Sequence, residues 1–221
     1  MDRTLSFLKE LVDAHGVPGF ESDVALVMAK HLKGVGKFSK DRLGSFICEK
    51  VGDPKGPRVM LAGHLDEVGF MVKSITKDGF IKFLPLGGWW GHVVLGQRLI
   101  IKTRKGDVLG VVGSKPPHDL RDEDRKKVLE IKDMYIDVGA SDGYDIRKKL
   151  DIRPGDPIVP DSAFTVLANP DLLLAKAWDN RIGCAMAIEV AKRLVGQKHP
   201  NTLLAVATVQ EEVGLRGAQT S

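Results

Sequence analysis

The sequence predicts an α/β domain that is interrupted by a smaller all-β module. Three observations support this fold class. Apolar residues recur at helical spacing near the start and then give way to strand-like runs. Short β runs between glycines and charged turns fill the middle of the chain, and a strand–helix–strand pattern returns near its end. We therefore expect α/β segments at residues 1–69 and 165–221, with an inserted β domain at residues 70–164.

The first α/β segment is expected to contain two helices followed by two strands. Leucines at helical spacing within residues 1–13 predict an amphipathic helix. A second helix is expected to run from Ser22, whose hydroxyl can cap it, to about Lys33. Residues 44–50 and 58–62 have the composition of strands.

The middle of the chain predicts a small β-barrel or β-sandwich. Hairpin turns are expected at Lys77–Gly79 and Lys105–Asp107, where glycine accompanies charged residues. One short helix is expected at Glu123–Lys132. The strand-like runs of this module include residues 70–72, 80–84, 99–102 and 108–112.

The last segment returns to the α/β pattern. A strand is expected at Leu172–Lys176, and a helix that is apolar on one face is expected at Asp179–Leu194. Residues 203–209 are apolar on both faces, which is typical of a strand that is covered on each side. This strand is therefore expected at the centre of a sheet.

Composition places the chain among ordinary globular proteins and argues against two kinds of partner. Of 221 residues, 43% are hydrophobic and 28% are charged, and the net charge is only +4 because 33 basic residues face 29 acidic ones. Charged runs are short or mixed in sign, so no nucleic-acid partner is expected. No apolar run approaches the length of a membrane span, and the N-terminus lacks the apolar core of a signal peptide, so no membrane partner is expected.

The two cysteines, Cys48 and Cys184, are far apart in the sequence. Because no close pair exists, a structural zinc site built on thiolates is excluded. Both residues lie in apolar stretches and are expected to pack as small hydrophobic side chains without a disulfide. A reducing, cytoplasmic location is therefore expected.

Polar side chains that follow apolar runs are the candidates for chemistry. His64 and Asp66 follow one such run, Asp179 opens a helix, and Glu211 and Glu212 follow residues 203–209. Ligands of α/β sheets bind at the carboxyl ends of the strands, and paired carboxylates there need a positive partner. These residues therefore predict a metal site. Asp66 can fix the orientation of His64, Asp179 can bridge two cations, and the glutamates can divide metal binding and proton transfer between them.

Each candidate also has a simpler interpretation. His64 can be a turn histidine hydrogen-bonded to Asp66, and Asp179 can be only a helix N-cap. The glutamate pair can lie on the surface, paired with Arg216. A glycosidase pair is disfavoured, because neighbouring residues at one strand exit are poorly placed to flank a sugar bond.

Three ordered motifs resemble those of the tetrahedral aminopeptidases, family forty-two of the metallopeptidases. The motifs are Ala62–Phe70, Ala175–Gly183 and Val209–Gly217. The family includes glutamyl and deblocking aminopeptidases, and some of its members were once labelled cellulases or endoglucanases. Gly87–Trp89 and Lys115–His118 also resemble the family, so the resemblance spans essentially the whole chain.

The resemblance implies both a fold and a reaction. The fold would be a mixed-sheet metallopeptidase catalytic domain interrupted by an inserted small β-barrel (PDZ-like) domain. That inserted domain would mediate dimerisation, and the dimers would assemble into a hollow tetrahedral dodecamer. The reaction would be the removal of N-terminal residues from peptides with a free N-terminus.

The resemblance also implies two divalent cations per subunit, commonly zinc or cobalt, and the ligand types suit manganese as well. His64 would bind one cation, Glu212 the other, and Asp179 both. Asp66 would orient His64, and Glu211 would be the general base. The peptide bond that follows Asp179 is expected to be cis.

Chains of that family continue well past the glutamate pair, and the later part supplies an aspartate and a histidine to the metals. We therefore expect residues 1–221 to be a portion of a longer enzyme, with an exposed apolar sheet edge. The alternative is a noncatalytic assembly subunit that keeps the β domain but lacks the full set of metal ligands. A β-glucanase function is a distant third, because it rests on labels and not on residue geometry.

Overall fold

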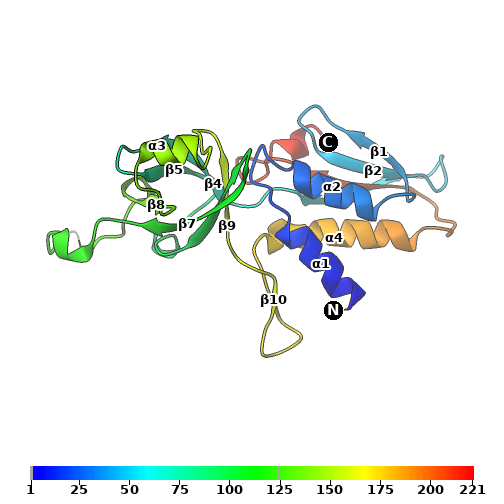
Figure 1. The fold of residues 1–221 in the computed structure, drawn as a ribbon. Coiled ribbons are helices and arrows are strands. Elements are labelled where there is room, and N and C mark those ends of the chain that lie inside the picture. Colours follow the sequence, from blue (N-terminus) through cyan, green and yellow to red (C-terminus); the bar gives the residue numbers. More distant parts are fainter. Residues whose placement is uncertain (1, 124) are drawn as a thin grey trace. The chain divides into compact units, whose positions relative to one another are not determined.

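The computed structural model describes residues 2–123 and 125–221. The chain divides into two compact units, both visible in Figure 1: unit 1 comprises Met1–Glu67 and Ala163–Ser221, and unit 2 comprises Val68–Ser162. Unit 1 is therefore discontinuous in the sequence, and unit 2 is continuous. Within the described ranges, no helix combines the length and the apolar character that crossing a bilayer requires.

Unit 1 is built on a mixed, four-stranded sheet with the order β1-β2-β12-β3. Strand β12 pairs antiparallel with β2 and parallel with β3, so the expected central position of the strand at residues 203–209 is confirmed. The predicted mixed-sheet α/β class is confirmed as well. The strands are β1 (Lys37–Lys40), β2 (Phe46–Lys50), β3 (Arg58–His64) and β12 (Thr202–Thr208).

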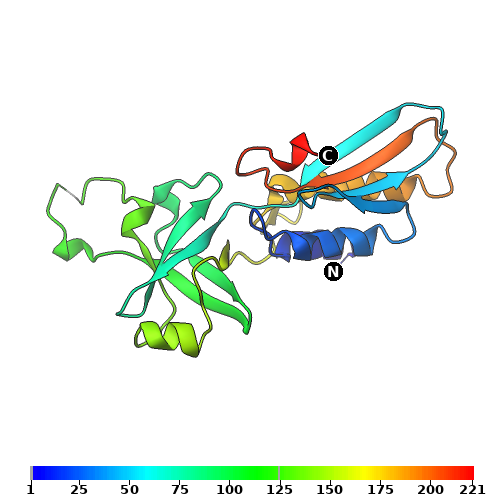
Figure 2. The same ribbon diagram turned by 90° about the horizontal axis from the view of Figure 1, so that it is seen from above.

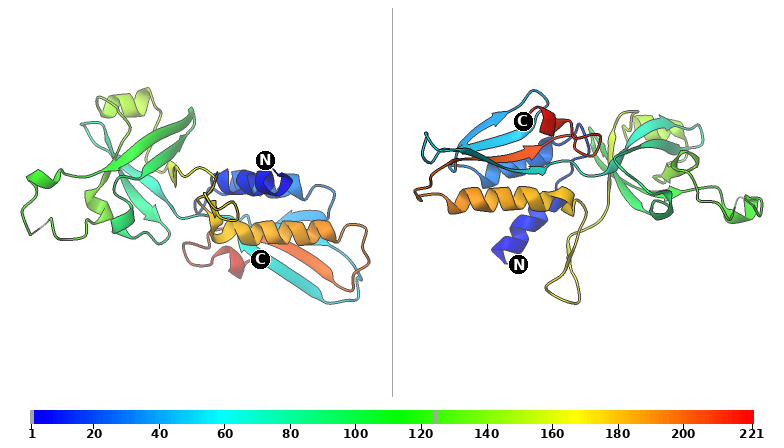
Figure 3. Two further views of the ribbon diagram at one scale, coloured as in Figure 1. Left: turned by 90° about the horizontal axis from the view of Figure 1, so that it is seen from below. Right: turned by 180° about the vertical axis from the view of Figure 1, so that it is seen from behind.

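Helices cover one face of this sheet. Residues Leu203, Ala205 and Ala207 alternate along β12, so their side chains share that face and are buried in the core of unit 1. Met28 and Ile188 meet them from two of the helices. Figure 3 shows α1 and α4 on the same side of the sheet. The helices are α1 (Arg3–Asp13), α2 (Ser22–His31) and α4 (Trp178–Arg193).

The structure corrects two details of unit 1. Ser22 lies inside α2, and the residue at its N-cap is Glu21, so the expected serine cap is wrong. The strand expected at Leu172–Lys176 is reduced to β11 (Leu173–Leu174), which pairs with β10 (Thr165–Val166) outside the main sheet. This leucine run pairs with the nearest extended segment and forms the hairpin that projects from unit 1 in Figure 1.

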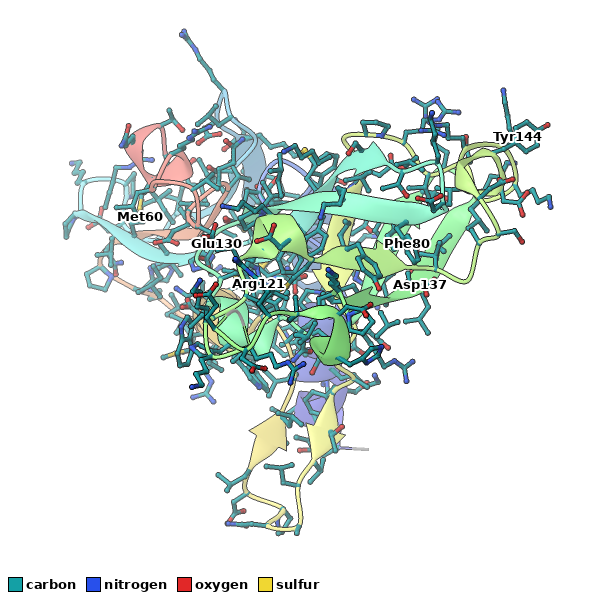
Figure 4. All side chains as sticks on the ribbon, turned by 90° about the vertical axis from the view of Figure 1, so that its left-hand side faces the viewer. Met60, Phe80, Arg121, Glu130, Asp137 and Tyr144 are labelled. Atoms are coloured by element: carbon teal, nitrogen blue, oxygen red, sulfur yellow. The ribbon has the colours of Figure 1, made fainter. Side chains whose placement is uncertain are left out.

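Unit 2 is a closed barrel with the strand order β4-β5-β8-β7-β6-β9, in which every pairing is antiparallel. The predicted small barrel is confirmed, and the sandwich is excluded (Figure 2). Phe80 and Asp137, both labelled in Figure 4, lie opposite each other on β5 and β8. The strands are β4 (Gly69–Ile75), β5 (Phe80–Leu86), β6 (Arg98–Thr103), β7 (Gly106–Gly113), β8 (Tyr135–Asp137) and β9 (Pro157–Pro160).

The two predicted hairpin turns join neighbouring barrel strands. β4 and β5 meet across a turn that ends at Gly79, where φ is +82°, and Gly106 begins β7 with a φ of +124°. Side-chain-bearing residues rarely adopt such angles, so glycine is favoured at both positions. The barrel interior is apolar and includes Phe70, Ile101 and Ile136, none of which is exposed to solvent.

The helix expected at Glu123–Lys132 is wrong. Its described residues form turns and irregular structure up to the start of a 3₁₀ turn, and the remaining position, Asp124, lies outside the described residues. The charged run at its start offers no continuous apolar face for packing. A helix that the sequence did not predict, α3 (Gly143–Lys148), begins instead where the Asp142 carboxylate accepts two backbone N–H groups. The 3₁₀ turns are η1 (Gly91–Val93), η2 (Pro117–Asp119), η3 (Ile131–Asp133) and η4 (Gly217–Gln219).

Candidate metal centre

Strand pairing brings the ends of β3 and β12 to one edge of the sheet in unit 1. The two strands run parallel with His64 opposite Thr208, and the N–H of Leu65 donates to the carbonyl of Thr208 at 2.7 Å. Helix α4 lies against the same edge. A Cβ atom at Gly63 would come within 2.5 Å of the backbone nitrogen of Cys184, so only glycine allows this close approach. The polar residues that follow both strands therefore meet the start of α4.

His64 is buried, and both of its ring nitrogens face oxygen atoms. Nδ1 lies 2.9 Å from the main-chain carbonyl oxygen of Asp66, and Nε2 lies 3.1 Å from Oδ1 of Asp179. A neutral imidazole carries one N–H and can donate to only one of these acceptors. Donation from Nδ1 leaves the Nε2 lone pair directed at a carboxylate, an arrangement that a cation between the two atoms would stabilise.

Asp179 does not cap α4. The backbone at Asp179 and Asn180 is not helical, so the regular helix begins after them, and Oδ1 of Asn180 accepts the N–H of Gly183 at 3.0 Å as an N-cap does. The interpretation of Asp179 as a simple N-cap is therefore wrong. The Asp179–Asn180 peptide bond is cis, as the resemblance led us to expect. The Asp179 side chain is 88% exposed and leaves an oxygen open to solvent beside His64.

Asp66 is fully buried, and its carboxylate holds the turn that carries the two glutamates. Oδ1 accepts the N–H of Glu211 at 3.0 Å, and Oδ2 accepts that of Glu212 at 2.9 Å. The carboxylate lies 3.7 Å from Nδ1 of His64, whereas the main-chain carbonyl of Asp66 lies within hydrogen-bond distance of that nitrogen. The main chain of Asp66 thus contacts the imidazole, and its side chain contacts the glutamate turn.

The glutamate pair lies at the same place and does not pair with Arg216, whose guanidinium donates to the side chain of Gln210. Oε2 of Glu211 lies 3.7 Å from Nε2 of His64. Burial raises the pKa of Glu212, and nearby carboxylates act in the same direction against the lowering effect of His64. A bound cation would reverse that repulsion.

One ligand atom each from His64, Asp179 and Glu212 lies within 4.8 Å of the others. The set combines an imidazole nitrogen with two carboxylate oxygens, the donor types that zinc, cobalt and manganese accept. The residues therefore fit a divalent cation. All five candidates of the sequence analysis lie in this one cluster, although their individual roles stay predictions.

Sequence reasoning missed a buried ionic cluster behind the candidate centre. Nζ of Lys176 lies 2.6 Å from Oε1 of Glu67, and the guanidinium of Arg181 lies 3.6 Å from the same oxygen. Arg181 also donates to the main-chain carbonyls of Leu11, Ala14 and Leu65. The sequence positions of these residues could have pointed to the cluster, because Glu67 directly follows Asp66 and the two basic residues flank Asp179.

These features define a class of protein: a mixed α/β domain with a candidate divalent-metal site at the carboxyl ends of its strands. Comparison with known proteins narrows the class. The chain belongs to the M42 glutamyl aminopeptidase family, whose profile matches residues 44–221, while the AMPT profile matches residues 2–28. The predicted family resemblance is confirmed.

Individual relatives agree with this assignment. The chain is 39% identical to the glutamyl aminopeptidase of Lactococcus lactis, over 97% of this chain and 61% of that protein. The TET aminopeptidase of a marine-sediment Thaumarchaeota archaeon has a TM-score of 0.95 and 44% identity, with 99% of this chain and 62% of that one covered. The TET1 peptidase of Pyrococcus horikoshii has a TM-score of 0.87 and 30% identity, with 98% and 64% covered. The chain thus spans about three fifths of the length of these relatives.

Proposed function

We propose that the chain acts, within its full-length protein, as a metal-dependent aminopeptidase that removes N-terminal residues from peptides. The observation that carries the proposal is the convergence of His64, Asp179 and Glu212, whose ligand atoms lie within 4.8 Å of one another in an M42-family fold. The glutamyl and TET aminopeptidases among its relatives support the substrate class.

Three residues would hold the cations. His64 would bind one cation, Glu212 would bind a second, and Asp179 would bind both. Divalent cations, when bound, polarise the scissile carbonyl and lower the pKa of the attacking water. Zinc or cobalt is our first choice, and the donor set also suits manganese.

Glu211 would be the general base of the reaction. Its carboxylate would accept the proton of the attacking water and deliver it to the amine of the departing peptide. The position of its Oε2, 3.7 Å from Nε2 of His64, supports this role. Asp66 would hold His64 and the glutamate turn in fixed relative positions, because its main chain contacts His64 and its carboxylate accepts two N–H groups of that turn.

Amino-acid release from defined peptides tests the proposal. Full-length protein should lose activity on metal removal, recover it with zinc or cobalt, and cleave peptides with a free N-terminus but not their N-acetylated forms. Activity that survives exhaustive chelation would contradict the metal dependence, and equal cleavage of acetylated peptides would contradict the aminopeptidase assignment.

A noncatalytic assembly subunit is the alternative, and metal analysis separates it from the enzyme. About two tightly bound cations per chain, as in dinuclear hydrolases, would count against it. The converging donor set of the centre already favours the enzyme. Among the residues that the structure describes, no geometry favours a β-glucanase.

We also propose that the protein self-associates through the inserted β domain and that its dimers build a dodecamer. The related Pyrococcus horikoshii peptidase can assemble into a tetrahedron or a large octahedral shell. Native mass spectrometry of the full-length protein tests this, and a monomer at micromolar concentration would contradict it. Cytoplasmic location, which the free, buried Cys48 and Cys184 support, can be checked by cell fractionation.

A further inference from the structure

Main-chain hydrogen bonds hold the turn that carries both glutamates. Three successive N–H groups point at buried carboxylates: Gln210 donates to Oε1 of Glu21 at 3.1 Å, and Glu211 and Glu212 donate to Asp66 at 3.0 and 2.9 Å. Consecutive main-chain N–H groups that converge in this way form a concave site that normally binds an anion. Here carboxylates of the protein itself occupy it.

Glu21 comes from a distant part of the chain. It occupies the N-cap of α2, where a polar side chain usually accepts an N–H of its own helix. Glu21 makes no such bond, and its Oε1 instead accepts the N–H of Gly19 at 2.8 Å and that of Gln210 at 3.1 Å. The residue is only 7% exposed, so water has little access to replace it.

Gln210 is the residue whose conformation needs this support. Its φ of 54° lies in the left-handed region, which residues with side chains seldom occupy. Such a conformation persists where the surroundings over-determine it. The N–H of Gln210 binds Glu21, and its carbonyl accepts the N–H of Arg216 at 3.2 Å. These two bonds fix both sides of the residue that precedes Glu211.

We infer that Glu21 is a positioning residue for the candidate centre: its carboxylate fixes the backbone of Gln210 and thereby directs the side chains of Glu211 and Glu212. The inference rests on the proposed function, which gives those two glutamates their roles. A misplacement of about 1 Å can lower a catalytic rate about 10²-fold. A loss of this contact should therefore lower kcat more than it changes KM.

Two variants separate the reach of the side chain from its charge. Glu21→Gln keeps the length and an acceptor oxygen but removes the charge, whereas Glu21→Asp keeps the charge but is one methylene too short to reach Gln210. We expect Glu21→Gln to retain kcat within about threefold, and Glu21→Asp to lose about tenfold to a hundredfold of kcat with KM nearly unchanged. Asp23→Asn is the matched control, because Asp23 is the exposed carboxylate in the first turn of α2.

Amide hydrogen exchange of the metal-free protein provides a readout that does not depend on activity. Peptides that cover residues 209–216 should exchange faster in Glu21→Asp than in wild type, and should be unchanged in Glu21→Gln and Asp23→Asn. Normal exchange and normal kcat in Glu21→Asp would overturn the inference. If Glu21→Asp does not fold, Glu21→Ala takes its place, and normal exchange at residues 209–216 together with normal kcat in that variant would overturn the inference.

The same measurements distinguish a failure of the proposed function from a failure of the positioning role of Glu21. If wild type lacks aminopeptidase activity but exchange at residues 209–216 responds to Glu21→Asp, the proposed function fails and the positioning contact stands. If wild type is active and neither exchange nor kcat responds, the positioning role fails and the proposed function stands.

Discussion

Four carboxylates surround one imidazole at the candidate centre: those of Asp66, Asp179, Glu211 and Glu212 around His64. Two of them differ sharply in exposure, since Asp66 is fully buried and the Asp179 side chain is 88% exposed. The buried carboxylate is satisfied by main-chain N–H groups. The exposed one has an oxygen free for a ligand from solvent, so the two aspartates suit different tasks.

The adjacent glutamates allow a matched pair of substitutions. Glu211→Gln should lower kcat about 10²- to 10⁴-fold, because the amide cannot accept the proton of water, and should leave the metal content unchanged. Glu212→Gln should lower the metal content, because a neutral amide is a weaker ligand for a hard cation than a carboxylate. Steady-state kinetics and elemental analysis of both proteins check this. The reverse pattern would exchange the two roles.

The candidate centre could be predicted from the sequence because its residues directly follow apolar runs, where one strand or helix determines their place. His64 ends β3, and Glu212 lies four residues after the end of β12. The contact between Glu21 and Gln210 could not be predicted, because the two residues are 189 positions apart and a glutamate before a helix usually interacts with that helix. Only the tertiary structure shows that the Glu21 side chain accepts the N–H of Gln210 in place of an N–H of its own helix.

Helices and strands could be predicted where apolar residues follow a clear pattern. They could not be predicted where polar side chains determine whether a helix forms. The apolar run at residues 203–209, which leaves neither face polar, sufficed to predict a central strand. Helix α3 was missed because Asp142 caps a segment with few apolar residues. The expected helix at Glu123–Lys132 failed because charge alone gives no face to bury.

The buried ionic cluster ties three elements together. Glu67 follows β3, and Lys176 precedes α4. Arg181 lies in the first turn of α4 and donates to main-chain carbonyls at the end of α1. Burial lowers the pKa of Lys176, and the nearby Glu67 carboxylate opposes that shift. The pair is only 6% and 2% exposed, so each charge depends on the other.

Glu67→Gln should therefore destabilise the protein by about 3–5 kcal/mol, because it leaves the two buried cations uncompensated. Adding Lys176→Met to Glu67→Gln should recover part of that loss, since one of the cations is then removed. Urea unfolding of the single and double variants measures the free energies. Additive losses would show that the two side chains are energetically independent.

An ion-pair network joins α1 and α2 and predicts a pH dependence. Lys30 and His31 of α2 contact the Glu10 carboxylate at 2.5 and 2.9 Å, and the Lys30 hydrogen bond in particular lowers the pKa of Glu10 from its ordinary value of 4.5. A carboxylate whose pKa is lowered in the folded state contributes stability above its unfolded pKa and loses it as the pH falls.

Wild type should therefore be more stable than Glu10→Gln at neutral pH, by a margin that shrinks as the pH falls below about 4.5. Because Lys30 is partly exposed, added salt should also reduce the margin. Paired unfolding curves at pH 7 and pH 3.5 provide the measurement. A constant difference across that range would contradict the expected linkage.

An unpaired apolar face remains on unit 1. Ile182, Met186 and Val190 lie four residues apart along α4 and are 45%, 63% and 38% exposed. On the neighbouring β3, which pairs only with β12 among the described residues, Val59 and Met60 are also exposed. Contiguous apolar surface of this kind marks an interaction site or a tendency to aggregate.

The 221-residue chain should therefore self-associate, and Met186→Lys with Val190→Lys should reduce this. Size-exclusion chromatography with light scattering over a concentration series measures the effect. Leu26→Lys with Val51→Lys is the control, since both residues are exposed in unit 1 outside α4 and β3 and the two substitutions add the same charge. An equal effect of both changes would indicate that charge alone is responsible.

The division of unit 1 between two stretches of sequence has a consequence for biosynthesis. Residues 68–162 leave the ribosome as one uninterrupted stretch, so the barrel can fold while the sheet of unit 1 still lacks β12. His64 emerges long before Glu212, and the nascent chain must keep the unfinished sheet protected until its central strand arrives. The candidate metal-binding residues can therefore converge only after the whole barrel has been synthesised.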